Sequence, residues 1–163
     1  MMKKIKYLIR KYFTVKPKYS LLEYLVLRAW PSPHFGLGKE GREVRCIVLH
    51  GTAANSLQST LEWFQNKDSC VSAHYVIDKD GIVVQCVALK DIAWHAGKSV
   101  WRNNDGVNKF SVGIELVNRE DGTDSYPVNQ VNACLTLCLA LCKVYALDTD
   151  SITTHKDISN GRK

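Results

Sequence analysis

Hydrophobic residues along this chain change their spacing several times, and each change predicts a new element. Residues 43–50 (EVRCIVLH) become continuously apolar towards their end, which is typical of a strand in the middle of a sheet. Residues 57–66 instead repeat apolar side chains at helical spacing behind Ser56, a suitable N-cap. The longest helical pattern covers residues 128–147, with Pro127 just ahead of it.

Four further segments predict strands. Residues 72–78 and 81–88 are joined by an Asp-Lys-Asp-Gly turn, which indicates a hairpin. Residues 111–118 (SVGIELVN) form another apolar strand pattern, and residues 151–155 (SITTH) a short last one. Strands that alternate with helices indicate an α/β fold, with a mixed central β-sheet of five or six strands flanked by helices.

The start of the chain has a different character. Residues 19–30 predict a short amphipathic helix, and the Pro- and Gly-rich residues 31–41 predict a connector that stops it. A chain of 163 residues with 45% hydrophobic residues fits one globular domain. We therefore predict a basic N-terminal arm over residues 1–42 and a single domain over residues 43–163.

Positive charge is concentrated in this arm. Residues 1–30 hold eight lysines and arginines against Glu23 alone, so the net charge of this segment is +7. The whole chain has a net charge of +6, so the remaining residues together carry −1. Such an arm is attracted to an anionic envelope, a membrane surface or nucleic acid, although a solvated helix face explains it equally well. Apart from its tyrosines and Phe13 the arm lacks aromatic residues for base stacking, so we expect no specific nucleic-acid partner.

Location and redox state follow from the same residues. Charged residues interrupt every apolar run near the start, so we expect no signal peptide and no transmembrane helix. The protein is expected to stay in the cytoplasm until something releases it. Cys134, Cys138 and Cys142 share one helical face, where four-residue spacing could offer thiolates to a metal. We favour buried small hydrophobic residues instead.

Candidate chemistry comes from two histidines at strand ends. His50 and His155 each follow a strand pattern and precede a polar loop, so neighbouring strands would bring both imidazoles to one zinc ion. Zinc lowers the pKa of a bound water and polarises a carbonyl, as amide hydrolysis at neutral pH requires. Glu115, an acid inside an apolar strand, is the candidate for proton transfer. The alternatives are a histidine that merely ends a strand and a salt-bridged structural glutamate.

Five segments in order carry a resemblance to a known family: IVLHGTA, SAHYVID, DIAWHAGKS, SVGIELVN and TTHKDISNGRK. Together they resemble the zinc-dependent N-acetylmuramoyl-L-alanine amidases, which share their domain with peptidoglycan recognition proteins and phage lysins. The similarity covers residues 44–163. It implies a mixed sheet flanked by helices, a zinc ion in a surface groove, and hydrolysis of the amide that joins N-acetylmuramic acid to L-alanine in peptidoglycan.

The resemblance also implies roles for single residues. His50 and His155 correspond to zinc ligands, and Glu115 to the acid/base residue that acts on the zinc-bound water. Lys163 matches a lysine that stabilises the oxyanion of the tetrahedral intermediate, a role that suits its charge. Tyr75 falls where some phage members place a tyrosine near the zinc.

Contacts to the substrate are implied for three more residues. His95 corresponds to a residue at the edge of the groove, with Trp94 as its apolar neighbour and Thr52 as a further substrate contact. His74 is interpreted as structural, and His34 receives no role.

One departure from the family concerns the third zinc ligand. In the family this ligand, an Asp or a Cys, lies two residues beyond the lysine, whereas the present sequence ends at Lys163. Three explanations are open: a shortened chain, a ligand from another residue, or a domain that binds without cutting. Asp157, two residues from His155, matches a loop position and not the ligand position. We expect the first explanation, and with it weakened zinc binding and loss of activity in the 163-residue chain.

The resemblance thus predicts a monomeric hydrolase, endolysin-like and bacteriolytic, that degrades the bacterial cell wall and binds muramyl peptide. The basic arm would help such an enzyme to reach the anionic surface around peptidoglycan. Two alternatives stay open: a non-catalytic peptidoglycan-binding domain and a cytoplasmic amidase of cell-wall recycling. The presence of His50, His155 and Glu115 favours catalysis.

Overall fold

A mixed six-stranded sheet forms the centre of the computed structural model, which describes residue 7 and residues 27–159. The strand order is β1-β5-β4-β9-β3-β10, and every neighbouring pair is parallel except the β4–β5 hairpin. The strands are β1 (Leu27–Ala29), β3 (Cys46–Gly51), β4 (Tyr75–Ile77), β5 (Val83–Gln85), β9 (Ser111–Leu116) and β10 (Ile152–Thr154). The predicted mixed sheet of five or six strands is confirmed.

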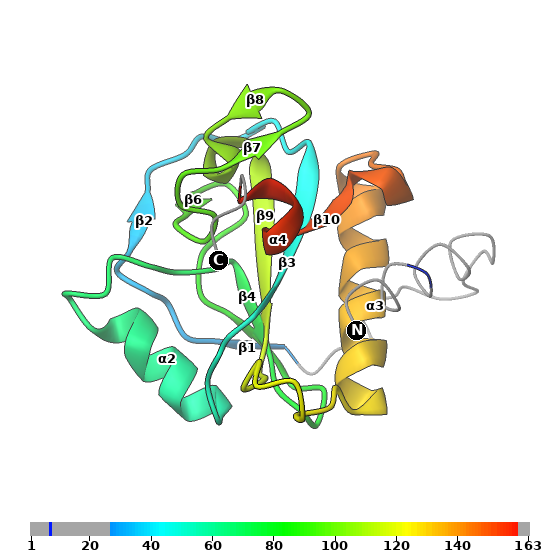
Figure 1. Ribbon diagram of the computed structural model, residues 1–163. Helices are drawn as coiled ribbons and strands as arrows, with labels where there is room; N and C mark the ends of the chain where they lie inside the picture. The colour runs from blue at the N-terminus through cyan, green and yellow to red at the C-terminus, as the bar shows by residue number, and fades with distance from the viewer. Residues whose placement is uncertain (1–6, 8–26, 160–163) are drawn as a thin grey trace.

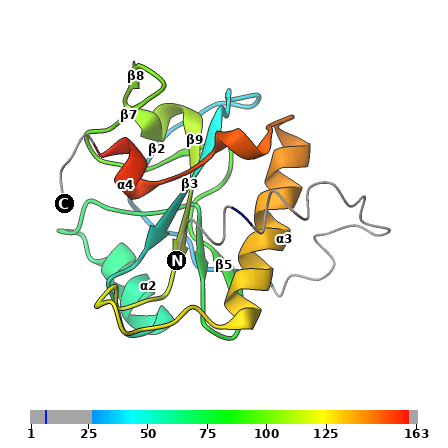
Figure 2. The ribbon, with the colours of Figure 1, turned by 45° about the vertical axis from the view of Figure 1, so that its right-hand side comes forward.

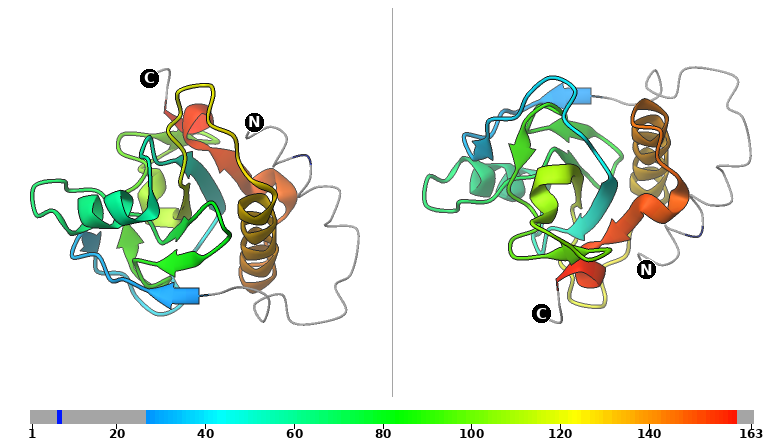
Figure 3. Two further views of the ribbon diagram at one scale, coloured as in Figure 1. Left: turned by 90° about the horizontal axis from the view of Figure 1, so that it is seen from below. Right: turned by 90° about the horizontal axis from the view of Figure 1, so that it is seen from above.

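Helices cover both faces of this sheet. Helix α3 packs on one face, and α2 and α4 lie on the other (Figures 1 and 2). Seen from below or above, the sheet lies between α2 and α3 (Figure 3). The helices are α2 (Leu57–Gln65), α3 (Val128–Val144) and α4 (His155–Ile158), with 3-10 turns η2 (Val107–Phe110) and η3 (Thr149–Ser151). Two small antiparallel pairs, β2 (Phe35–Gly36) with β6 (Ile92–Ala93) and β7 (Val100–Trp101) with β8 (Asn104–Asp105), complete the fold.

Strand alternation divides the side chains of β3 and β9 between two environments. Alternate residues such as Leu49 and Ile114 pack into the core under α3. The residues between them point to the opposite face, where Val48 joins a smaller cluster beside α4. His50 lies two residues after Val48, and Glu115 is the partner of His50 in the β3–β9 register, so the strand period directs both side chains away from the α3 core.

The helices predicted over residues 57–66 and 128–147 are confirmed as α2 and α3. Ser56 caps α2, since its side chain accepts a hydrogen bond from the backbone N–H of Ser59 at 3.1 Å. Leu61 and Phe64 then bury one face of α2 against Val76 and its neighbours. In α3 the predicted burial of the three cysteines is also confirmed; all six cysteines of the chain are free, and only Cys70 is exposed.

The segment before residue 43 differs from its prediction. Leu27–Ala29 form β1 beside β5, so the predicted helix is wrong there, and residues 19–26 lie outside the described residues. Arg42 donates hydrogen bonds to the carbonyls of Leu89 and Ser111, which attaches the connector to the domain. The division into residues 1–42 and 43–163 stays a prediction, but the sheet already begins at residue 27. Over the described part of the chain, no helix has the length and apolarity needed to span a membrane.

The packing of α3 yields a first prediction. Leu137 is 2% exposed in the core under α3, so Leu137→Ala is expected to lower the free energy of unfolding by about 2–5 kcal/mol. Val144, on the same helix, is 64% exposed, and Val144→Ala should change it by less than about 0.5 kcal/mol. Urea denaturation measures both, and equal effects would show that α3 is not packed as described.

Candidate active site

The two strand-end histidines meet at one edge of the sheet. Strand β10 pairs in parallel with β3 so that Thr154 lies beside Leu49, and the next residue of each strand is a histidine. Thr154 caps α4 through a 3.3 Å hydrogen bond from Asp157 N, which turns the chain immediately after the strand. His155 Nδ1 and His50 Nδ1 are 2.9 Å apart. The predicted convergence of the two histidines is therefore confirmed.

Glu115 lies beside this pair. It is directly opposite His50 in the β3–β9 register, and its Oε1 is 3.9 Å from His50 Nδ1. Its side chain is 14% exposed, and Oε2 is buried with no hydrogen-bond partner among the described residues. Burial raises the pKa of Glu115 to about 8, with the charge of Glu120 as a second cause. Since desolvation lowers the pKa of His50 to about 3, His50 is neutral and gives Glu115 no ion pair.

His95 occupies a deeper position than the predicted groove edge. It is 8% exposed, and its Nδ1 lies 3.0 Å from His50 Nε2. On its other side, His95 Nε2 lies 3.0 Å from Ser111 Oγ. Desolvation, reinforced by the neighbouring His50, His74 and His155, holds the pKa of His95 well below its usual range, so this imidazole is neutral as well.

A cleft of about 740 Å³ opens in front of these residues. Its apolar lining includes Trp63 and Trp94, which are 52% and 37% exposed. Polar and ionisable side chains make up much of the remaining lining. The lining residues are His50, Gly51, Thr52, Ala53, Ala54, Ser59, Thr60, Trp63, Phe64, Val71, Ser72, Trp94, His95, Glu115, Glu120, His155, Lys156 and Ser159. Six of the eight residues predicted for the site thus lie in one cleft.

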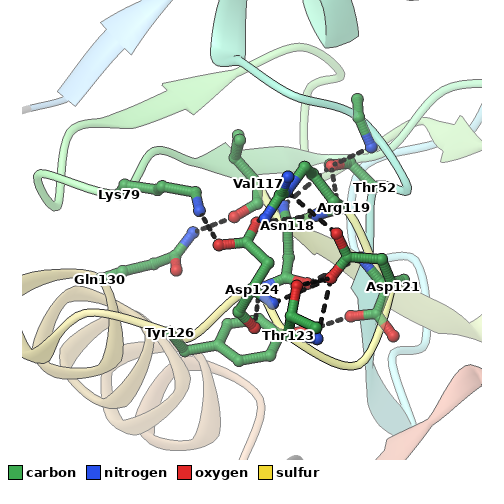
Figure 4. A network of polar contacts seen from close by, with 12 residues as sticks. Thr52, Lys79, Val117, Asn118, Arg119, Asp121, Thr123, Asp124, Tyr126 and Gln130 are labelled. Atoms are coloured by element: carbon green, nitrogen blue, oxygen red, sulfur yellow. Dashed lines mark hydrogen bonds and ion pairs between the residues drawn. The ribbon is translucent and has the colours of Figure 1, made fainter.

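The loop after β3 and the loop after β9 together form one wall of the cleft, and they are bonded to one another. Thr52 Oγ1 donates to Asn118 O at 3.3 Å and accepts from Ala54 N and Asn118 N, so its hydroxyl fixes the wall. Behind it, Asp124 bonds to Lys79 and to the backbone N of Arg119 (Figure 4). The loop after β9 is therefore tied to the loop after β3 and to the β4–β5 turn.

Glu120 and Trp63 line the cleft but were not among the site residues predicted from the sequence. Glu120 accepts a hydrogen bond from Tyr126, and its carboxylate lies over Gly51, where any Cβ would collide with it. The backbone of Glu120 is left-handed, with φ of 55°. This conformation is uncommon for glutamate, so the sequence could not predict where its side chain points. Trp63 could have been found as the large apolar residue on the polar face of the predicted helix.

Several predicted residues are not brought to the site. Tyr75 belongs to the core under α3, because its parity in β4 is that of Ile77, so it does not reach the histidines. Asp157 is exposed on α4 and is not one of the residues that line the cleft. Lys163 lies outside the described residues. His74 is buried, accepts from Gly113 N and contacts Asp91 O, as a structural histidine should.

The donor set fits zinc in part. Two neutral imidazoles with facing Nδ1 atoms and a buried unpaired carboxylate oxygen suit a catalytic zinc site. Within residues 27–159 no group of three His, Cys, Asp or Glu side chains could hold a metal ion. The described residues therefore supply two convergent nitrogen atoms of the kind that binds zinc.

Comparisons with known proteins agree with this geometry. Residues 40–163 match the family model for N-acetylmuramoyl-L-alanine amidase. The 1,6-anhydro-N-acetylmuramyl-L-alanine amidase AmpD of Enterobacter cloacae is 39% identical over 152 residues, covering 82% of this chain and 79% of the relative. A crystal structure of an AmpD derivative superposes with a TM-score of 0.68 at 26% identity, covering 85% of this chain and 86% of that one.

A second structure extends the comparison. Escherichia coli AmiD in complex with the substrate anhydro-N-acetylmuramic acid-L-Ala-D-γ-Glu-L-Lys has a TM-score of 0.66 at 28% identity and matches 77% of this chain and 54% of that one. Endolysins such as a mutant endolysin from Bacillus subtilis share the fold at 20% identity. The chain therefore belongs to the N-acetylmuramoyl-L-alanine amidase family, whose members cleave the amide between N-acetylmuramic acid and L-alanine in peptidoglycan.

Proposed function

We propose that this amidase acts on soluble muramyl-peptide fragments with a 1,6-anhydro sugar, and that zinc held by His50 and His155 assists Glu115 in the hydrolysis. The observation that carries the proposal is the convergence of the two Nδ1 atoms beside the buried carboxyl of Glu115. AmpD relatives at 38–39% identity, named for the anhydro substrate, support the choice of fragment. Likeness to endolysins near 20% identity supports the fold alone.

Each residue in the cleft has a chemical task in this proposal. His50 and His155 would present neutral Nδ1 lone pairs to the metal, and zinc would supply Lewis-acid polarisation of the amide carbonyl. Because the positive charge of bound zinc would lower the pKa of Glu115 from its metal-free value, Glu115 would be ionised and would take a proton from the attacking water. It would then return this proton to the nitrogen of L-alanine, which leaves as an amine. Its Oε2 is available for that proton because no described group bonds to it.

The remaining lining residues would position the substrate. Trp94 offers an exposed ring to the cleft, and the Thr52 hydroxyl fixes the loops that line it beside the histidines. Lys163, outside the described residues, is proposed to stabilise the oxyanion, as the family resemblance implies. The third zinc ligand is proposed to come from beyond the described residues.

Substrate choice can be tested directly. In a chain that includes the third zinc ligand, we expect faster release of L-alanine amino termini from an anhydromuramyl tripeptide than from intact peptidoglycan sacculi, by about tenfold or more per amide present. A chelator should abolish both rates, and added zinc should restore them. Faster release from sacculi would favour an endolysin, and unaltered rates in chelator would contradict zinc dependence.

Glu115 is tested by its isosteric amide. Glu115→Gln should lower kcat about 10²- to 10⁴-fold, because a general acid/base contributes that much, and should leave fragment binding within a few-fold. Glu62→Gln is the matched control, since Glu62 is exposed on α2 and bonds to Gln58. Kinetics with the anhydromuramyl tripeptide and calorimetric binding measure the two effects. Full activity in Glu115→Gln would remove Glu115 from the reaction.

Stability should depend on pH through the same residue. In metal-free protein the folded state keeps the proton of Glu115 up to about pH 8, whereas the unfolded state releases it near 4.5. Rising pH between these values therefore favours unfolding, by at most about 1.4 kcal/mol per pH unit. Glu115→Gln has no such proton, so its stability relative to the parent should increase from pH 5 to pH 8. Urea unfolding in chelator measures this, and parallel curves would contradict it.

A further inference from the structure

We propose that His95, supported by Ser111, is a positioning residue that fixes the tautomer of His50, so that the Nδ1 lone pair of His50 faces the metal. The inference rests on the proposed ligation of zinc by His50 and His155. It assigns to His95 a task behind the ligand, in place of the substrate contact expected at the edge of the groove.

Three contacts in a row carry the inference. His155 Nδ1 lies 2.9 Å from His50 Nδ1, His50 Nε2 lies 3.0 Å from His95 Nδ1, and His95 Nε2 lies 3.0 Å from Ser111 Oγ. The rings of His50 and His95 meet edge to face, at an interplanar angle of 83°. His50, His95 and Ser111 are 4%, 8% and 0% exposed, so water does not replace these bonds.

Hydrogen-bond chemistry determines the direction of this row. A neutral imidazole carries one N–H, so His50 can offer Nδ1 to a metal only when its proton is on Nε2. That proton is then donated to His95 Nδ1, which must be unprotonated. His95 consequently carries its own proton on Nε2 and donates it to Ser111 Oγ. The opposite tautomer of His50 would direct an N–H at the metal position.

The fold makes room for the ring of His95 at a specific cost. Gly113 lies in the middle of β9, and a Cβ there would stand 2.8 Å from His95 Nδ1 and closer still to two ring carbons. Glycine inside a strand is less favourable than alanine, because it loses more backbone entropy on folding. From the other side, Asn108 Oδ1 accepts from the backbone N of His95 and of Ala96, at 3.2 and 2.8 Å. The ring is thus held between a strand and a fixed turn.

Packing alone would not require nitrogen at these positions. A leucine would fill the space beside Gly113 but would leave the N–H of His50 without an acceptor inside the protein, and a buried donor without a partner is destabilising. Hydrogen-bond partners behind a metal-ligating histidine typically change metal affinity 10- to 100-fold. The requirement for an acceptor at Nδ1 therefore separates a positioning role from a structural one.

The test compares two substitutions at one position. His95→Leu removes the acceptor, whereas His95→Asn places Oδ1 close to where Nδ1 was. Zinc affinity is measured by competition with a chromophoric chelator, and the tautomer of His50 by two-bond ¹H–¹⁵N NMR of the metal-free chain. We expect His95→Leu to weaken zinc binding 10- to 100-fold and to lose the Nε2–H tautomer, and His95→Asn to stay within about threefold of the parent.

Two further variants serve as support and control. Ser111→Ala, a small change that keeps the fold, should weaken zinc binding about three- to tenfold because His95 loses its acceptor. His34→Leu removes another buried histidine, which bonds to Asn66 O and does not line the cleft, and should leave zinc affinity unchanged. Unchanged affinity and tautomer in both His95→Leu and Ser111→Ala would overturn the inference, as would an equal loss in His95→Leu and His95→Asn.

A separate variant distinguishes failure of the proposed zinc site from failure of the role assigned to His95. His155→Ala should abolish zinc binding if the proposed site is correct, and unaltered affinity there would reject the site. Measuring the tautomer of His50 in the metal-free chain tests the role of His95 independently of zinc binding. A His50 that keeps its proton on Nδ1 in the parent chain would overturn the role of His95 even if zinc binds.

Discussion

The register between β3 and β9 is the constraint on which the rest of the site depends. His50 and Glu115 are direct partners in this pairing, and both point away from α3. Because side chains alternate along a strand, a slip of one residue would move the histidine and the acid into the apolar core. The continuous burial of Leu49 and Ile114 under α3 prevents that slip, so hydrophobic packing on one face sets the chemistry on the other.

That division also explains how the domain tolerates several buried ionisable groups. Three neutral imidazoles and the Glu115 carboxyl lie on one face, and each costs free energy if its polar atoms lack partners. His74 bonds to backbone groups, and His95 bonds to His50 and to the hydroxyl of Ser111, whereas Glu115 Oε2 has no partner among residues 27–159. In the proposed function this unpaired atom receives the proton of the attacking water, and the well-packed α3 face offsets the cost of burying it.

Much of this arrangement could be predicted from the sequence. The periods of hydrophobic residues located β3, α2, the β4–β5 hairpin, β9 and α3. The position of a histidine at the end of each of two strand patterns predicted that His50 and His155 lie close together. The helix predicted over residues 19–30 was wrong at residues 27–29, because a short apolar run fits either element and pairing with β5 decides. The depth of His95 depends on the space above Gly113, and the direction of Tyr75 on strand pairing, so neither is visible in local patterns.

The bonded walls of the cleft have a thermodynamic consequence. Thr52 and Asn118 join the loops after β3 and β9, and Asp124 and Lys79 extend this connection to the β4–β5 turn (Figure 4). A cleft whose walls are already ordered loses little conformational entropy when it closes around a molecule. The entropic cost of association then falls mainly on the flexible peptide stem. Burial of the exposed tryptophans should appear as a negative heat-capacity change, without the larger contribution that folding of a loop would add.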